Sequence, residues 1–227
     1  MSHEQPSPRR GRLIVFEGLD RSGKSTQCER LVTWLREKQD RGSWHMRFPD
    51  RTTVIGQMIN GYLQGASQQE DHAIHLLFSA NRWEAADRIK QLISSGIDVV
   101  IDRYYYSGCV YSAAKQNPTM DLAWCRNMEV GLPRPDLCLF LDISAEDAAK
   151  RGGFGTERYE KQELQDRVRG LFAEMQTHPD ENEDMIVIDA GGTVEHVQQT
   201  IQNVVIKRCL DIAVDQERQP LRVIKPW

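Results

Sequence analysis

The sequence has 227 residues, a hydrophobic content of 40% and a formal net charge of −4. A chain of this length can bury one sizeable core, so we expect a single domain. The negative charge argues against a nucleic-acid-binding protein, because binding along a phosphate backbone needs a surplus of Lys and Arg on one face. An anionic ligand would therefore need a local positive site.

The cysteines and the chain ends bear on where the protein works. The five cysteines are scattered and include no C-x-x-C pair, so neither a disulfide framework nor a zinc site is predicted. Residues 1–11 lack the apolar stretch of a signal peptide, and no apolar run reaches membrane-spanning length. We expect a cytoplasmic protein, with the nucleus as a second location, that has a disordered leader at residues 1–11 and no membrane partner.

Short apolar runs rich in β-branched residues alternate with longer amphipathic stretches. In chain order they predict a strand at 13–16, a helix at 25–39, a weaker strand at 44–48, a helix at 70–93, and strands at 99–101, 137–141 and 185–188. The alternation predicts an α/β fold with a parallel sheet, whose ligands bind beyond the carboxyl ends of the strands. The polar end of the chain, residues 211–227, is either disordered or packed on the domain.

Residues 18–25 directly follow the first predicted strand and match the pattern G-x-x-x-x-G-K-[ST]. The glycines allow backbone N–H groups to surround a phosphate, and the positive end of the following helix adds to the attraction. Lys24 would reach the β- and γ-phosphates, and Ser25 would supply a hydroxyl to Mg²⁺. Kinases, GTPases and ATP-driven machines share this pattern. A GTPase is disfavoured because no N-K-x-D motif follows.

Charged residues follow other predicted turns and strands. Asp102 and Arg103 come directly after the strand at 99–101, where a carboxylate can orient Mg²⁺, directly or through water, and a guanidinium can meet the transferred phosphoryl group. A surface salt bridge is the alternative, which this edge position disfavours. Arg21 lies inside the phosphate loop and Arg51 follows a turn. Several arginines favour phosphoryl transfer between two anions over simple ATP hydrolysis.

Two further segments have a functional and a structural interpretation. Phe78 and Arg82 stand four residues apart and share a helix face, so they could stack on a nucleobase and donate to its carbonyl. From spacing alone they could equally be a core residue and a solvated one. The glycine-rich segment at about 151–160 suits a lid that closes over phosphates, or a plain surface loop.

Six blocks of sequence resemble thymidylate kinase, most closely its eukaryotic branch, over about residues 12–209. The blocks are residues 16–26, 48–51, 76–84, 102–104, 131–136 and 157–160. The resemblance implies a P-loop kinase domain over residues 12–210 with a five-stranded parallel sheet flanked by helices, and a tail at 211–227. It also implies ATP as donor with Mg²⁺, dTMP as acceptor, dTDP as product in dTTP synthesis, and a homodimer.

The resemblance further implies site residues. Catalytic roles fall to Arg21, Lys24, Asp102 and Arg103, and metal binding to Ser25 and Asp102. The ATP contacts are Gly18, Arg21, Ser22, Gly23, Lys24, Ser25, Thr26 and Arg151. The dTMP contacts are Asp20, Phe48, Arg51, Leu63, Phe78, Arg82, Arg103, Ser107, Gly108, Tyr159 and Gln165.

Within the dTMP set the resemblance assigns individual contacts. The residue matching Phe78 stacks on thymine and the one matching Arg82 bonds its exocyclic oxygen. Those matching Arg51 and Arg103 hold the acceptor phosphate, Asp20 lies near the sugar 3′-hydroxyl, and Tyr159 lies where a 2′-hydroxyl would clash. Arg21 indicates a catalytic arginine in the phosphate loop, although the lid also carries Arg151 and Arg158.

Two other hypotheses remain open at this point. A kinase for another monophosphate, such as dUMP or UMP, would share the phosphate loop and the arginines. A nucleotide-binding interaction protein would share the loop without turning over. A panel of acceptors distinguishes a kinase for another monophosphate from a dTMP kinase. Steady turnover of ATP and an acceptor excludes the interaction protein.

Overall fold

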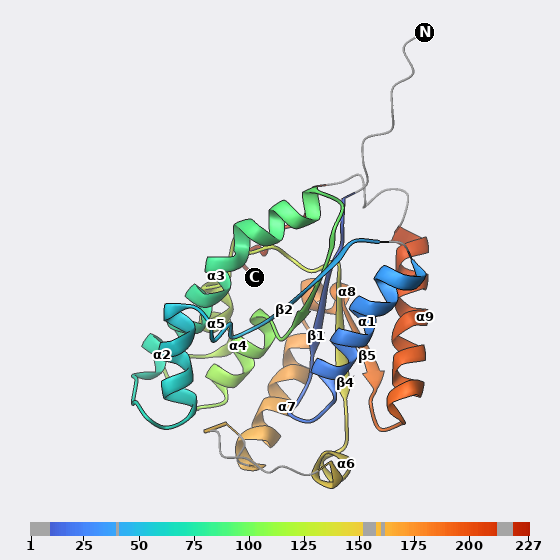
Figure 1. Cartoon of the computed structure of the whole chain (residues 1–227). Helices are drawn as coiled ribbons and strands as arrows, with labels where there is room; N and C mark the ends of the chain where they lie inside the picture. The colour runs from blue at the N-terminus through green and yellow to red at the C-terminus, as the bar shows by residue number, and fades with distance from the viewer. Residues whose placement is uncertain (1–9, 40, 152–157, 160–161, 213–219) are drawn as a thin grey trace.

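A five-stranded parallel sheet forms the centre of the molecule (Figure 1). The structure, a computed structural model, describes residues 10–39, 41–151, 158–159, 162–212 and 220–227. The strand order is β2 (Ser43–Arg47), β3 (Asp98–Asp102), β1 (Leu13–Glu17), β4 (Leu137–Asp142) and β5 (Met185–Asp189). The predicted sheet is thus confirmed, including its weaker strand. The register pairs Phe16 with Asp102, which brings the carboxyl ends of β1 and β3 to the same edge.

Helices cover both faces of the sheet. They are α1 (Lys24–Lys38), α2 (Val54–Leu63), α3 (Asp71–Ser94), α4 (Tyr105–Ala113), α5 (Leu122–Asn127), α6 (Ala145–Lys150), α7 (Gln162–Gln176), α8 (Pro179–Asp184) and α9 (Val194–Ile212). The helices predicted at 25–39 and 70–93 correspond to α1 and α3. Across the part of the chain that the structure describes, no helix has the length and apolarity needed to cross a membrane.

Alternate side chains of β1 enter two different cores, as the period of a strand requires. Leu13 and Val15 join the cluster that packs under α3, α4 and α7, whereas Ile14 and Phe16 join the cluster under α1 and α9. In Figure 1, α1 and α9 lie together on one side of the sheet. Because β1 is buried on both faces, its sequence is continuously apolar until Glu17.

Both described ends of the chain pack on the domain. The Arg10 guanidinium lies 2.7 Å from an Asp136 carboxylate oxygen, so the ordered domain includes the end of the predicted leader. Residues 1–9 lie outside the described residues. Near the other end, Ile224 is buried and exchanges backbone hydrogen bonds of 2.9 Å with Gly131 and Leu132. Of the two alternatives for the tail, packing therefore holds for residues 220–227.

Candidate active site

The phosphate loop joins β1 to α1 in the context that its motif predicts. Gly18 has a φ of +135°, and a Cβ there would lie 2.4 Å from the carbonyl oxygen of Leu141. Gly23, the residue before α1, has a φ of +90°. Arg21 also adopts a left-handed conformation, with φ at +67°, which is strained for a residue with a side chain. The loop therefore carries backbone strain where the sequence predicts phosphate chemistry.

Lys24 is buried at the base of this loop. Its Nζ donates hydrogen bonds to the carbonyl oxygen of Leu19 at 2.6 Å and to Ser22 Oγ at 3.3 Å. Burial, together with the positive charge of Arg103, lowers the Lys24 pKa to about 8. A bound phosphate would favour the charged form of this amine. The loop therefore places an amine whose charge an anionic ligand can stabilise.

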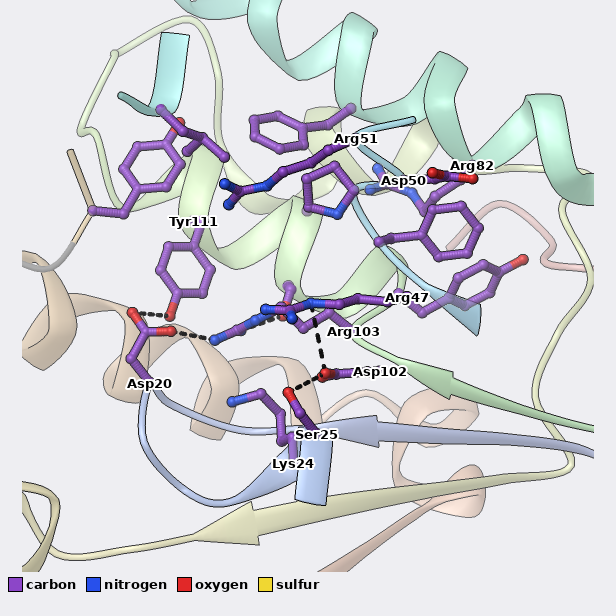
Figure 2. A pocket seen from close by; sticks show the side chains of 18 of the residues that line it. Asp20, Lys24, Ser25, Arg47, Asp50, Arg51, Arg82, Asp102, Arg103 and Tyr111 are labelled. Carbon is purple, nitrogen blue, oxygen red and sulfur yellow. Dashed lines mark hydrogen bonds and ion pairs between the residues drawn. The ribbon is translucent and has the colours of Figure 1, made fainter. Parts of the chain in front are cut away.

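The two residues predicted to hold a metal ion lie together at the edge of the sheet. Ser25 Oγ donates a hydrogen bond of 2.5 Å to Asp102 Oδ2 (Figure 2). A hydroxyl and a carboxylate suit Mg²⁺, which proteins hold through one or two oxygen ligands together with substrate phosphates. Among the described residues, no group of three or more His, Cys, Asp or Glu side chains could hold a metal ion. The residues present thus fit Mg²⁺ that arrives with a nucleotide.

Arg103 follows β3 and, like Arg21, has a left-handed backbone with φ at +65°. Its Nη1 donates to the carbonyl oxygen of Gly18 at 3.2 Å and to Ser107 Oγ at 3.0 Å, and its Nη2 pairs with Asp20. Burial raises the Asp20 pKa, but the positive charges of Arg103 and Lys24 outweigh it, so the pKa is lowered. Asp20 is therefore ionised at neutral pH and holds Arg103 in place.

Arg82 on α3 is buried with only 2% of its surface exposed. Its Nε and Nη2 donate to the Glu129 carboxylate at 2.8 and 2.5 Å. Gly108 faces the same guanidinium, because a Cβ at this position would lie 2.6 Å from Nη2. Burial opposes the charge on Arg82, but Glu129 outweighs it and raises the Arg82 pKa. Arg82 is therefore a permanent cation with a fixed orientation, and Nη1 is not used by Glu129.

A cavity of about 740 Å³ connects these groups. Lys24 and Ser25 lie at one end of it, Arg103 and Arg47 lie next, and Arg51 and Arg82 lie at the other end (Figure 2). The predicted residues that line the cavity are Asp20, Arg21, Gly23, Lys24, Ser25, Thr26, Phe48, Arg51, Leu63, Phe78, Arg82, Asp102, Arg103, Ser107, Gly108 and Tyr159. The sequence therefore predicted most of the lining.

Several predicted residues lie beside the cavity. Gln165 donates to Asp20 Oδ2 and to the carbonyl oxygen of Tyr159, each at 2.9 Å, so it supports two lining residues. Gly18 and Ser22 are part of the phosphate loop, and Ser22 Oγ accepts a hydrogen bond from Lys24 Nζ at 3.3 Å. Arg151 donates to the carbonyl oxygen of Arg21 at 3.0 Å.

The predicted lid lies mostly outside the described residues, which include only its residues 151, 158 and 159. Arg158 is directed toward α2, where it donates to the carbonyl oxygen of Tyr62 at 3.1 Å and to Gln68 at 3.0 Å. It does not line the cavity. Of the three candidate arginines, Arg21 is the one that lines it.

The sequence analysis missed several residues that shape the site. Arg47 ends β2, and its Nε lies 3.7 Å from Asp102 Oδ2. Asp102 was predicted because charged residues at the carboxyl ends of parallel strands lie near the ligand, and the same rule could have identified Arg47. Tyr111 lies on α4 one turn beyond Ser107, and its ring centroid is 5.4 Å from the Arg103 guanidinium. Glu129 and Glu17 carry no local signal, because their partners lie 47 and 87–90 residues away.

Comparison with known proteins gives consistent matches over most of the chain. A family model described as thymidylate kinase matches residues 16–201. The chain is 48% identical to thymidylate kinase of Danio rerio over 197 residues, which cover 87% of this chain and 91% of the relative. It is 47% identical to thymidylate kinase of Homo sapiens over 194 residues, with coverage of 86% and 89%.

A solved structure of thymidylate kinase from Candida albicans superposes with a TM-score of 0.81 and 36% sequence identity. The match covers 95% of this chain and 99% of that one.

Proposed function

The chain belongs to the thymidylate kinase family, and on that premise we propose how its site transfers the γ-phosphoryl group of ATP to dTMP. The reaction yields dTDP and ADP, with a phosphate group as acceptor. The observation that carries the proposal is a continuous cavity, which has the phosphate loop at one end and Arg82 of α3 at the other, and which Phe78 also lines. One substrate would enter from each end.

The donor binds at the phosphate loop. Backbone N–H groups of residues 18–25 surround the β- and γ-phosphates, Lys24 neutralises their charge, and Thr26 lies at the start of α1 beside them. Bound Mg²⁺, held by Ser25 and Asp102, would neutralise charge on the phosphate oxygens. Arg151 would contact the donor from the outer side of the loop, where it already touches the Arg21 backbone.

The acceptor binds at the opposite end with its phosphate toward the donor. Arg51 and Arg103 hold that phosphate, Phe78 stacks on thymine, and Arg82 donates Nη1 to a thymine carbonyl. Asp20 and Tyr159 lie near the sugar. Phe48, Leu63, Ser107 and Gly108 complete the wall, and Gln165 acts by supporting Asp20 and Tyr159.

Catalysis in this arrangement is mainly positioning and charge stabilisation. The acceptor phosphate is already ionised at neutral pH, so the reaction needs no strong general base. The in-line transfer places developing negative charge on the equatorial oxygens, which guanidinium groups stabilise. Arg21, strained in the loop and lining the cavity, is the side chain proposed to act on the transferring group.

We also propose a homodimer formed through α3. Leu76 and Trp83 are 46% and 40% exposed, and with Ala80 between them they form an apolar stripe along this helix. A second copy of the same stripe would bury it. Light scattering on a sizing column should show a dimer, and Leu76→Glu together with Trp83→Glu should yield a monomer. A monomeric unmodified protein would refute the proposal.

A cytoplasmic location, with the nucleus as a second site, is the remaining proposal. It is supported by Cys28, Cys109, Cys125 and Cys138, which are buried free thiols as expected in a reducing compartment. Imaging of a tagged full-length chain would test it, and secretion or organelle import would refute it.

An acceptor panel tests the reaction. ADP release should be measured with dTMP, dUMP, UMP, dCMP and AMP, each with excess Mg²⁺ and with a chelator. We expect the highest kcat/KM with dTMP and loss of turnover with the chelator. ATP-analogue binding by calorimetry, with and without Mg²⁺, provides a second readout of the metal. Preference for another acceptor, or binding without turnover, would contradict the proposal.

A further inference from the structure

Glu17 is a fully buried carboxylate whose role the proposed reaction does not explain. It ends β1 and directly precedes Gly18, the first residue of the phosphate loop, and none of its surface is exposed. Its Oε1 accepts hydrogen bonds from the backbone N–H groups of Tyr104 at 2.8 Å and Ser107 at 3.1 Å. Its Oε2 accepts a hydrogen bond from Ser107 Oγ at 2.5 Å.

These contacts make Glu17 the N-terminal cap of α4. A helix begins with N–H groups that lack partners, and a side chain at the cap position usually accepts from them. Tyr104, the cap residue of α4, makes no such bond. Glu17 supplies it from another strand. It thereby fixes the chain immediately after Arg103, which has a left-handed backbone and whose N–H donates to Phe16 at 3.0 Å.

The Ser107 hydroxyl extends this support to the Arg103 side chain. A hydroxyl has one hydrogen, and Ser107 donates it to Glu17. Its oxygen can therefore accept from Arg103 Nη1, which lies at 3.0 Å and can only donate. The direction of every bond in the series depends on Glu17 being an acceptor at both oxygens.

We propose that Glu17 is a positioning residue for phosphoryl transfer, which orients Arg103 through the start of α4 and through Ser107. The inference rests on the proposed binding of the acceptor phosphate by Arg103. Since Gly18 follows Glu17 in the chain, one buried carboxylate joins the donor loop to the acceptor arginine. The Gly18 carbonyl oxygen accepts from Arg103 Nη1 at 3.2 Å, which reinforces the connection.

Glu17→Gln tests the acceptor requirement with little change in shape. The amide NH₂ group would face either the two backbone N–H donors or the Ser107 hydroxyl. In the second case Ser107 must turn its hydrogen toward Arg103, which cannot accept it. We expect kcat/KM for dTMP to fall at least about tenfold, with kcat and KM both affected, because a charge-assisted contact is misaligned. The dissociation constant of an ATP analogue should stay within about threefold.

Glu181→Gln is the matched control. Glu181 is 1% exposed and binds Arg126 at 2.7 Å. It also accepts a hydrogen bond of 3.3 Å from Tyr105, which lies on α4, the helix that Glu17 caps, but Glu181 does not line the cavity. The Glu181→Gln variant should have a lower melting temperature but no selective loss of kcat/KM for dTMP. If both variants change the dTMP and ATP constants alike, Glu17 has only a structural role and the inference fails.

Ser107→Ala removes the hydroxyl but keeps the cap bonds, and it tests the inference where Glu17→Gln does not fold. We expect a smaller fall in kcat/KM for dTMP in this single variant. Where Glu17→Gln does fold, the double variant should lose clearly less kcat/KM than the two single effects combined. Additive effects, or unchanged kinetics in Ser107→Ala, would overturn the inference. Failure of the reaction itself would appear separately, as absent dTMP turnover in the unmodified enzyme.

Discussion

Replacing Arg82 by alanine should damage both stability and the use of dTMP, and the two effects can be separated. The change leaves the Glu129 carboxylate buried and unpaired, since both of its bonds to Arg82 are lost. Breaking a buried ion pair from one side costs about 3–5 kcal/mol. For a domain of this size, that corresponds to a fall in melting temperature of about 6–20 °C.

The effect on dTMP adds to this loss of stability. Removing a charge-assisted hydrogen bond to the base costs about 1.5–3 kcal/mol, or a fall of about 10- to 150-fold in kcat/KM for dTMP. The dissociation constant of an ATP analogue should change little, because the phosphate loop lies at the other end of the cavity. Steady-state kinetics, calorimetry and thermal melting on the same preparation measure all three.

The double variant Arg82→Met/Glu129→Leu separates the two roles. It removes both charges, so most of the lost stability should return. The use of dTMP should not return, because no donor remains for the base. If the double variant regains both melting temperature and kcat/KM for dTMP, Arg82 has only a structural role and the reasoning is wrong. An equal loss in ATP affinity would also refute it.

Three other changes test the rest of the site. Gly108→Ala should lower kcat/KM for dTMP with little change in ATP affinity. The new Cβ would lie only 2.6 Å from Arg82 Nη2, so the guanidinium would have to move. Unchanged dTMP kinetics would contradict this. Arg21→Ala should lower kcat far more than it weakens ATP binding, whereas a rise in the ATP KM alone would exclude a transition-state role. Lys24→Met should abolish turnover, since no charge would neutralise the β- and γ-phosphates. The Lys24 pKa of about 8, against an ordinary 10.5, means that the unfolded chain binds more protons between these pH values, so this residue makes the ligand-free protein more stable as pH rises through that window. Binding of an ATP analogue should restore the positive charge on Lys24, so the protein should take up a proton on binding near pH 8.5. Calorimetry in buffers of different ionisation enthalpy would detect this uptake, and equal uptake in Lys24→Met would contradict the assignment.

Residues whose function depends on a local pattern were predictable from the sequence. The phosphate loop is one continuous motif after a strand, and its glycines are required by backbone geometry at Gly18 and Gly23. Asp102 ends a buried strand and Arg103 follows it, and parallel strands bring their carboxyl ends to one edge. Ser25 follows β1 through the phosphate loop, and Asp102 ends the neighbouring strand β3, so their contact follows from the sheet order.

The supporting residues could be found only in the folded chain. Glu129 fixes Arg82 from a turn 47 residues away, and Glu17 caps a helix that begins 88 residues later in the chain. Sequence spacing left Phe78 as either a core or a ligand residue, and Arg82 as either a solvated or a ligand residue. The structure shows that Arg82 is both buried and a lining residue, because an ion pair compensates its burial.

The amino-acid sequence by itself determined the α/β fold, the phosphate loop and the family, since these rest on periodic burial and on contiguous motifs that local chemistry constrains. Tertiary structure decided how each functional arginine is oriented. It also decided that residues 220–227 pack against the turn after Glu129, and that Arg158 binds the end of α2 and does not line the cavity. Such choices depend on charges and hydrogen-bond donors that meet only when distant segments fold together, so no local pattern encodes them.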